Sequence, residues 1–378
     1  MSAQRPGMPP RMPPVAAARM VEGAASALDA LKTRLLPAPA IMGTVLSGGM
    51  ILARCVSAAA ELRVADHLAE GPRDVEELAR LCDCNVDALY RFLRALAGHG
   101  IFEELDGRRF QLNRLSECLR SDVPMSLRGW AHYAGVEWYW QLWGSFVGTL
   151  RNGKTVHENL HERRFFEWYE ENPEYAEVFD EAMSSFSRVA NPAIVAGYDF
   201  AALETLVDVG GGQGSLLGTI LHACPRLRGT LFDQPQVIEK ARLAADLADP
   251  AVAERCEFVT GSFFDELPPG RDAYLFKWIL HDWTDDEVRR ILRNCRRAMA
   301  QGGPGGGRGR RLLVVEMLIE PGNRPSPAKL LDIAMLALTG GRERTAAEFR
   351  ALFEETGFLL QGIHPTVSPY SVIEAIAV

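Results

Sequence analysis

The sequence predicts an α/β domain with a mostly parallel sheet and helices on both faces, preceded by a mainly α-helical domain. From Leu206 onward, short apolar runs alternate with helical stretches, and this alternation is typical of a parallel sheet covered by helices. Before that point the chain shows helical patterns and a single hairpin. A length of 378 residues is enough for two or three domains, each with its own core.

The charge balance and the cysteine pattern argue against several classes of protein. Lysine and arginine number 41 and aspartate and glutamate 49, so the formal net charge is −8, which argues against a general nucleic-acid binder. The seven cysteines lack the regular spacing of a disulfide framework or a zinc site, and the sequence has no other metal-binding motif. The first twenty residues lack the apolar core of a secretory signal. We therefore expect a reduced, cytoplasmic protein without a metal ion.

The N-terminal part of the chain contains a segment without charged residues, which separates two predicted regions. We expect residues 1–34 to be disordered or extended, because five prolines lie among the first twenty residues. Residues 35–53 carry no charge but include two prolines and three glycines. A membrane-spanning helix prefers about 20 unbroken apolar residues. A buried or dimer-forming helix, without stable membrane insertion, is therefore the better interpretation.

Residues 44–122 follow the order helix, helix, helix, hairpin, which is the winged-helix pattern. Asp74 and Asn85 are the expected N-caps of the second and third helices, and Asp106-Gly107 is a strong hairpin signal. Between residues 74 and 97 there are three arginines and five acidic residues, so the net charge is 3 − 5 = −2. A helix that faces phosphates should not be acidic. A structural or dimerisation role is therefore favoured over DNA binding.

The remaining chain divides into an aromatic-rich helical region and the predicted sheet. Residues 123–200 are helical and rich in aromatic side chains, which often line a pocket or a buried interface. The last two strands, joined by a turn at Pro369, are expected to pair antiparallel at the edge of the sheet. The predicted strands cover residues 206–209, 230–232, 256–260, 273–276, 312–316, 359–364 and 371–376.

A glycine-rich turn after the first strand of the sheet is the most informative segment. The strand 206–209 leads into Gly210, Gly211 and Gly212 and then into a helix. Glycines at this position allow a tight turn and a close approach of the backbone to a ligand. Asp233 ends the next strand, 23 residues after Gly210, where a carboxylate is able to accept both hydroxyls of a ribose. The sequence therefore predicts a nucleoside-containing ligand at the carboxyl ends of these strands.

Four motifs in this order resemble those of a known enzyme family. They are Leu206–Gly214 (LVDVGGGQG), Phe232–Pro235 (FDQP), Lys277–Trp283 (KWILHDW) and Gly340–Thr345 (GGRERT). Together they resemble the S-adenosylmethionine-dependent O-methyltransferases of the plant caffeate/flavonoid and bacterial antibiotic-tailoring type, from about residue 45 to the C-terminus.

The resemblance implies a Rossmann-like methyltransferase domain with a mostly parallel seven-stranded sheet, and an N-terminal, mainly α, winged-helix-like dimerisation domain. It also implies a homodimer with a small-molecule acceptor and no nucleic-acid partner. The implied domains are a disordered or extended N-terminus, a dimerisation domain, a helical linker with pocket residues, and a cofactor-binding domain. Their boundaries are 1–34, 35–122, 123–200 and 201–378.

The resemblance also implies which residues bind S-adenosylmethionine. The motif that holds Asp208, Gly210, Gly211 and Gly212 would approach the methionine part of the cofactor, and Asp233 would hold its ribose. The family places an aspartate near the adenine at the position of Ser262, whose hydroxyl is able to accept one weaker hydrogen bond. Phe263 would pack against the adenine, and Lys277 matches a family lysine near the cofactor.

His281 matches the proposed general base of the family. A phenol has a pKa of about 10 and is mostly neutral at pH 7, so a base must take its proton as the oxygen attacks the methyl group. The site would align oxygen, carbon and sulfur in one line. Glu316 and Glu343 match two family acids that would orient the imidazole and stabilise its charged form. Asp282, next to the base, is more simply a cap of the local turn.

The acceptor site is defined by fewer residues. Met183 and Met335 align with methionines that sandwich an aromatic acceptor, and sulfur–aromatic contact gives this a physical basis. Trp278 and Asp332 are further expected acceptor contacts. The sequence thus predicts metal-independent methylation of a hydroxyl on a small, aromatic secondary metabolite. Two alternatives stay open: a relative that performs decarboxylation, hydroxylation or N-methylation, and a winged-helix sensor of S-adenosylmethionine.

Overall fold

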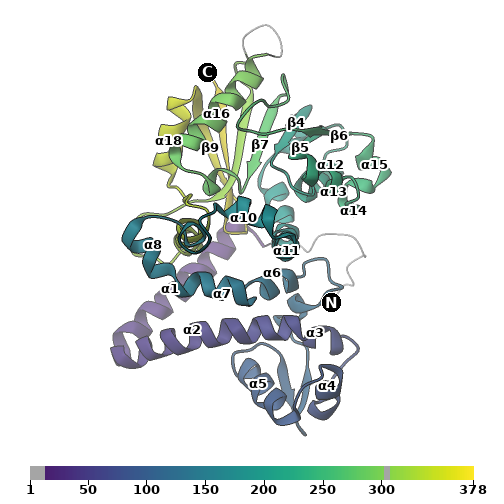
Figure 1. Cartoon of the computed structure of the whole chain (residues 1–378), viewed down its shortest axis with the longest axis vertical. Coiled ribbons are helices and arrows are strands. Elements are labelled where there is room, and N and C mark those ends of the chain that lie inside the picture. The colour runs from purple at the N-terminus through teal and green to yellow at the C-terminus, as the bar shows by residue number, and fades with distance from the viewer. Residues whose placement is uncertain (1–12, 302–306) are drawn as a thin grey trace. The chain divides into compact units, whose positions relative to one another are not determined.

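The computed structural model describes residues 13–301 and 307–378, which form two compact units. The α/β unit comprises residues 152–159 and 190–378 together with the N-terminal part up to Ser26. The helical unit comprises residues 27–151 and 160–189. Figure 1 shows the elements of both units.

The α/β unit is built on a seven-stranded sheet. Its strand order is β6-β5-β4-β7-β8-β10-β9. The first five strands in this order pair in parallel, and β10 pairs antiparallel with both β8 and β9. The mostly parallel sheet with an antiparallel edge is therefore confirmed. The strands are β4 (Thr205–Val209), β5 (Arg228–Asp233), β6 (Cys256–Thr260), β7 (Ala273–Lys277), β8 (Arg311–Met317), β9 (Phe358–Pro365) and β10 (Tyr370–Ala377).

Helices cover both faces of this sheet because its strands are apolar on both sides. On one face, α16 (Asp285–Ala300) and α18 (Ala346–Glu355) share a core with alternate residues of the strands. On the other face, Leu217 of α12 (Ser215–Ala223) packs on β5 so closely that Gly229 has no room for a Cβ. The further helices of this unit are α13 (Pro235–Ala241), α14 (Ala245–Ala248), α15 (Pro250–Ala253) and α17 (Pro327–Leu338), with 3-10 turns η2 (Phe200–Ala202) and η3 (Leu280–Asp282).

The N-terminal half of the helical unit has the predicted winged-helix order. The elements are α2 (Ala38–Glu61), α3 (Val64–His67), β1 (Arg73–Asp74), α4 (Val75–Leu81), α5 (Val86–Gly98), β2 (Glu103–Leu105) and β3 (Arg109–Gln111). The three strands form a small sheet in the order β1-β3-β2. Asp74 accepts a hydrogen bond from the backbone of Glu77, and Asn85 from that of Ala88. Both predicted N-caps are therefore confirmed.

The aromatic-rich region forms a series of helices. Within the helical unit, Tyr133 packs against Trp130, Trp138, Tyr139 and Phe179, with ring centroids 4.7–5.8 Å apart. These rings bury one another, which accounts for their density in the sequence. The elements are η1 (Ser116–Leu119), α6 (Arg128–Tyr133), α7 (Glu137–Gly144), α8 (Phe146–Asn152), α9 (Val156–His161), α10 (Phe165–Glu171) and α11 (Pro173–Gly197).

The N-terminus differs from the expected extended segment. Residues 15–35 form the helix α1 (Val15–Leu35), which has no buried residue. Seven of its residues are alanine, the strongest helix former, so local propensity accounts for a helix where proline content predicted an extended chain. Residues 1–12, the first part of the predicted segment, lie outside the described residues.

Among the residues that the structure describes, one helix is long and apolar enough to cross a membrane, by length and composition alone. It is α2, whose most apolar window has a mean hydropathy of 1.5 and is 6 % buried. The end of this helix packs into the winged-helix core, where Ala59 and Ala60 are almost completely buried. Met42, Val45, Leu46 and the neighbouring apolar residues of its first half are exposed.

The core under α16 gives a first prediction. Leu292 is completely buried there, so Leu292→Ala should lower the free energy of unfolding of the α/β unit by about 2–5 kcal/mol. The matched control is Leu243→Ala, because Leu243 is 87 % exposed and its truncation should change stability by less than about 0.5 kcal/mol. Denaturant titration of both variants measures the difference, and equal losses would contradict this view of the core.

Candidate active site

The predicted site residues of the α/β unit gather at the carboxyl edge of its sheet. The chain runs from β4 outward through β5 to β6, and then returns to the other side of β4 to form β7 and β8. The strand order therefore reverses between β4 and β7. In open α/β sheets, ligands bind outside the carboxyl ends of the strands at such a reversal.

The glycine loop after β4 has a backbone that only glycine adopts readily. Gly210, Gly212 and Gly214 have φ angles of 67°, 60° and 77°, in the left-handed region that disfavours other residues. A Cβ on Gly211 would lie 2.5 Å from a methyl carbon of Leu231, whereas a Cβ on Gly212 would meet nothing within 4 Å. The loop is therefore packed on its inner side and open at Gly212.

Asp233 is fixed beside this loop. Its Oδ2 accepts a hydrogen bond from the backbone N–H of Gly212 at 2.9 Å, and its Oδ1 accepts one from the N–H of Gln234 at 2.7 Å. A carboxylate has about four acceptor positions, so Asp233 keeps the capacity to accept further hydroxyl groups. The predicted ribose-binding residue and the predicted glycine loop therefore lie in direct contact.

Asp208 is buried beneath the loop, and the charges of Asp208 and Lys277 influence each other. Burial raises the pKa of Asp208, although the positive charge of Lys277 opposes this shift. Burial also lowers the pKa of Lys277, against the negative charge of Asp208. Oδ2 of Asp208 is buried and has no hydrogen-bond partner within the described part of the chain. Such an oxygen costs about 1–3 kcal/mol unless a ligand or water satisfies it, which fits a polar ligand at this edge.

Ser262 and Phe263 follow the end of β6 at the same edge. The hydroxyl of Ser262 accepts a hydrogen bond from the N–H of Phe264 at 3.2 Å, so it stabilises its own turn and keeps its proton for a second partner. A ring carbon of Phe263 lies 3.7 Å from the position of a Cβ on Gly210. Both residues therefore lie where the resemblance expects the adenine.

His281 occupies η3, immediately after β7. It is 7 % exposed, and its Nδ1 lies 2.6 Å from Oε1 of Glu343. Because a carboxylate accepts but does not donate, this contact places the proton of the neutral imidazole on Nδ1 and its lone pair on Nε2. The segment before His281 touches the glycine loop, since a Cβ on Gly210 would lie 2.5 Å from a methyl carbon of Ile279. The imidazole is thus adjacent to the predicted cofactor site.

The two predicted acids contact His281 in different ways. Glu343 binds the imidazole, whereas Oε1 of Glu316, on β8, accepts a hydrogen bond from the backbone N–H of His281 at 2.9 Å. Burial lowers the pKa of His281, but the negative charges of Asp282, Glu343 and Glu316 outweigh this effect and raise it above its ordinary value. Burial raises the pKa of Glu316 and of Asp282, and the charge of His281 opposes both shifts. The imidazole is therefore made more basic by its surroundings.

Three of the four residues expected to contact an acceptor lie close to this centre. Trp278 has a φ of 57°, strained for a bulky residue, and its ring centroid is 3.7 Å from Nζ of Lys277. Oδ1 of Asp332 accepts a hydrogen bond from the backbone N–H of Glu343 at 3.0 Å. Met335, one turn further along α17, is 8 % exposed.

The fourth expected contact, Met183, lies elsewhere in the chain. It belongs to the part of α11 that lies in the helical unit, so its contact with an acceptor stays a prediction. The same α11 enters the α/β unit at Ala190.

The structure adds three residues that sequence analysis did not assign to the centre. Oδ1 of Asp282, interpreted as a turn cap, lies 3.9 Å from Nε2 of His281. Gly341 lies against the turn, where a Cβ would be 1.9 Å from the carbonyl oxygen of His281. Arg344 is completely buried and bonded to the same turn. The motif Gly340–Thr345 contained the signal for the last two, but only the contacts show what each residue does.

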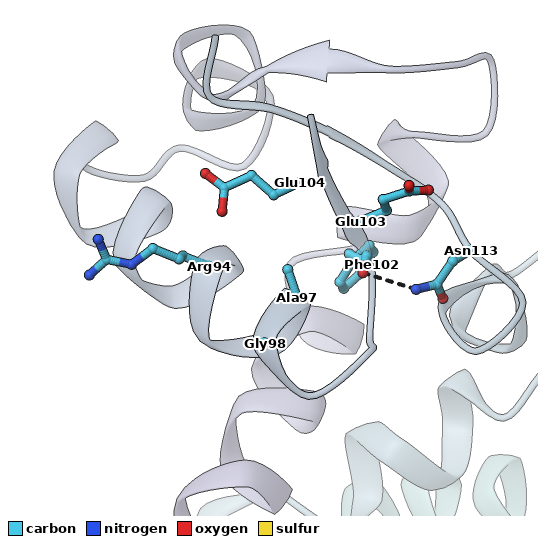
Figure 2. Close-up of a pocket in the computed structure, with 7 residues that line it drawn as sticks. All are labelled: Arg94, Ala97, Gly98, Phe102, Glu103, Glu104 and Asn113. Atoms are coloured by element: carbon cyan, nitrogen blue, oxygen red, sulfur yellow. Dashed lines mark hydrogen bonds between the residues drawn. The ribbon is translucent and has the colours of Figure 1, made fainter. Parts of the chain in front are cut away.

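A hollow in the winged-helix region contains none of the predicted site residues. It has a volume of about 460 Å³ and is lined by Arg94 and Gly98 of α5, Glu103 and Glu104 of β2, and Asn113 among others. Figure 2 shows the amide of Asn113 bonded to the carbonyl of Phe102, at 2.9 Å. Two carboxylates and one guanidinium make this surface unsuitable for a phosphate backbone.

No group of three or more histidine, cysteine, aspartate or glutamate side chains is placed to hold a metal ion within residues 13–301 and 307–378.

Comparison with known proteins decides the family. The model of an O-methyltransferase domain matches residues 141–359, and that of an O-methyltransferase dimerisation domain matches residues 45–122. The chain belongs to the O-methyltransferase family. Its fold is that of the S-adenosylmethionine-dependent methyltransferases, and the enzyme is an O-methyltransferase, as the four motifs predicted. The match to the dimerisation domain supports a homodimer.

Relatives from antibiotic biosynthesis agree with this assignment. The chain is 39 % identical to phenazine O-methyltransferase PhzM of Lysobacter antibioticus over 84 % of this chain and 90 % of the relative. It is 37 % identical to the mitomycin biosynthesis 6-O-methyltransferase of Streptomyces lavendulae, over 85 % and 90 %. The solved structure of CalO1, a methyltransferase in calicheamicin biosynthesis in its SAH-bound form, has a TM-score of 0.78 at 33 % identity, covering 90 % of this chain and 98 % of that one. These similarities support S-adenosylmethionine as the methyl donor.

The same family includes members with other chemistry. The aclacinomycin 10-hydroxylase RdmB of Streptomyces purpurascens is 33 % identical over 83 % of this chain and 83 % of its own length. The family model and the relatives named above favour O-methylation, and the acceptor and the base are left to be argued from the site.

The contact between Glu343 and His281 predicts a measurable pKa change. Glu343→Gln removes a negative charge and a charged hydrogen bond from the imidazole. The protonated form then loses stabilisation, so the pKa of His281 should fall toward the ordinary histidine range. Titration of the His281 imidazole by NMR measures the shift, with the exposed Glu320→Gln as control. A pKa that stays unchanged or rises in Glu343→Gln would contradict the assignment.

The contact between Asp233 and Gly212 predicts a binding defect. Asp233→Ala removes the acceptor that faces the glycine loop, and loss of a hydrogen bond to a charged group costs about 1.5–3 kcal/mol. The Kd for S-adenosylmethionine should therefore rise about 10- to 100-fold, measured by calorimetry. Asp249→Ala, in an exposed acid after α14, should leave this Kd unchanged; equal effects of the two variants would argue against a ribose-binding role.

Proposed function

We propose that this O-methyltransferase transfers a methyl group from S-adenosylmethionine to a hydroxyl of a small aromatic secondary metabolite, with His281 as the general base. One observation carries the proposal. His281 is buried at the carboxyl edge of the sheet and its Nδ1 is engaged by Glu343, so that the neutral imidazole would carry its lone pair on Nε2. A base in that state is suited to remove one proton from one hydroxyl.

The cofactor site is proposed to use the residues that fit it in shape and charge. The open backbone at Gly212 and the buried oxygen of Asp208 suit a polar ligand, and Asp233 suits a ribose. Phe263 and Ser262 would contact the adenine, with the Ser262 hydroxyl as a donor. Lys277, Gly210 and Gly211 complete the site. When bound, S-adenosylmethionine supplies an electrophilic methyl group on a positively charged sulfur.

The protein's own part in the reaction is positioning and proton removal. As the hydroxyl oxygen formed its bond to the methyl carbon, the bond from that carbon to the sulfonium sulfur would break with its electron pair left on sulfur, and the hydroxyl proton would pass to Nε2 of His281. Glu343 stabilises the imidazolium that results, as a carboxylate does in a catalytic triad. Glu316 holds the backbone of the same residue and adds a second negative charge. In this proposal no metal ion takes part, because His281 supplies the base.

The acceptor is proposed to lie against Trp278, Met335 and Met183, whose indole and thioether groups suit an aromatic ring. Asp332 acts on this site through Glu343, since its carboxylate holds the Glu343 backbone. The exposed apolar half of α2 is proposed to be covered by a second copy of the chain, and we expect the dimer in the cytoplasm.

The alternatives differ in what they require of His281. Decarboxylation, hydroxylation or N-methylation of a weakly acidic amine does not need a buried base with its Nε2 lone pair available, whereas O-methylation of a phenol does. The sensor alternative requires a nucleic-acid surface. The acidic residues Glu103 and Glu104 in the wing argue against one.

His281→Ala tests the proposal directly. Loss of general-base catalysis should lower methyl transfer by about 10²–10⁴-fold, while the Kd for S-adenosylmethionine stays unchanged. The assay is transfer of a labelled methyl group to a panel of phenolic, quinonoid and carotenoid acceptors, with products identified by mass. His222→Ala is the matched control, because that histidine is half exposed and 3.7 Å from Asp249. Unchanged turnover in His281→Ala, or products methylated on nitrogen only, would refute the proposal.

A further inference from the structure

Arg344 carries a permanent charge and yet is completely buried. Its guanidinium makes five hydrogen bonds. Nε and Nη2 donate to Oδ1 of Asp285 at 3.1 and 2.9 Å. Nη1 donates to the carbonyl oxygens of Leu280 and Arg342 at 2.9 and 3.3 Å, and Nη2 donates to that of Trp283 at 2.9 Å. These bonds account for the five N–H groups of a guanidinium, so the side chain has a single well-determined orientation.

Two of these bonds bracket the proposed base. Leu280 is the first residue of η3, and Trp283 directly follows its last residue. Arg344 is therefore bonded to both ends of the turn that carries His281. The backbone of Arg342 is also bonded to this turn, because its N–H donates to the carbonyl oxygen of His281 at 2.8 Å. One short segment therefore binds the ring of His281 through Glu343 and its backbone through Arg342 and Arg344.

We propose that Arg344 is a positioning residue for methyl transfer, which fixes the direction of Nε2 of His281 by clamping the η3 turn from both ends. The proposal rests on the proposed role of His281 as the base. Arg344 acts through that turn, and its guanidinium makes its contacts with the turn and with Asp285. Its planar fork bonds three carbonyls and a carboxylate at once, an arrangement that the three donors of a lysine ammonium do not reproduce.

The charge of Arg344 also bears on the buried acids. Burial raises the pKa of Glu316, and the positive charges of His281 and Arg344 oppose this rise. Asp285, the ion-pair partner of Arg344, has a side chain that is 39 % exposed and stands in the first turn of α16. The guanidinium therefore connects the N-terminus of α16, through Asp285, with the buried carboxylate of Glu316 near His281.

Arg344→Lys is the first variant to test. A displacement of about 1 Å at a reacting group can lower the rate about 100-fold, so we expect kcat to fall by about that factor. The Kd for S-adenosylmethionine should not change, because the glycine loop and Asp233 are untouched. Arg350→Lys is the matched control: Arg350 is exposed on α18, and the kcat of this variant should stay within about twofold of wild type.

Two further measurements separate positioning from a general loss of structure. In a His281→Ala background, Arg344→Lys should lower the residual kcat less than twofold, because the group through which it acts is gone. NMR titration of the His281 imidazole should give a changed pKa in Arg344→Lys and an unchanged one in Arg350→Lys. Asp285→Asn, which keeps the guanidinium but removes its charge partner, should give a smaller loss of the same kind and serves if Arg344→Lys does not fold.

The outcomes distinguish the two proposals. A wild-type kcat in Arg344→Lys, or an equal loss in both backgrounds, would overturn the positioning role. A fully active His281→Ala enzyme would refute the proposed base, whereas a shifted His281 titration in Arg344→Lys would still support the clamp on the turn.

Discussion

The 2.6 Å hydrogen bond between Nδ1 of His281 and Oε1 of Glu343 joins segments that are 62 residues apart in the sequence. It selects the tautomer of the imidazole and leaves Nε2 with its lone pair. Glu343 is itself held through its backbone by Asp332 of α17. The proposed chemistry depends on this bond because an imidazole that rotated freely would present either nitrogen, in either protonation state, to an acceptor.

The two functional parts of the α/β unit are coupled by close packing. Ile279, two residues before His281, touches the glycine loop at Gly210, and Asp233 bonds the same loop at Gly212. The glycine loop and the segment that leads into the η3 turn are therefore in direct contact. This arrangement follows from the strand order, since β4 and β7 are neighbours in the sheet although the chain forms β5 and β6 between them.

The unit buries several ionisable groups, and their charges are compensated locally. The charge of Arg344 is paired with Asp285 and hydrogen-bonded by backbone carbonyls, and the positive charge of Lys277 acts on the buried Asp208. Buried charges are poor contributors to stability unless they are paired and fully hydrogen-bonded. Their concentration at one edge of the sheet, away from the apolar core under α16 and α18, is typical of a site where function rather than stability selects the residues.

The sequence by itself determined the elements and the family. Apolar periodicity predicted all seven strands of the sheet. The side-chain caps at Asp74 and Asn85 could be predicted because capping is a local interaction. The glycine loop could be predicted for the same reason, because the left-handed backbone at Gly210 and Gly212 requires glycine at those positions. The helix α1 was missed because proline content was weighed above the alanines that follow it.

Only the tertiary structure showed which contact each predicted residue makes. Glu316 and Glu343 are equivalent as sequence matches, yet one binds the backbone of His281 and the other binds its ring. Asp332, for which an acceptor contact stays a prediction, also holds the backbone of Glu343. The place of Arg344 beneath the η3 turn depends on contacts between segments about 60 residues apart. Such contacts leave no periodicity in a single sequence, because their spacing is set by the folding of the sheet between them.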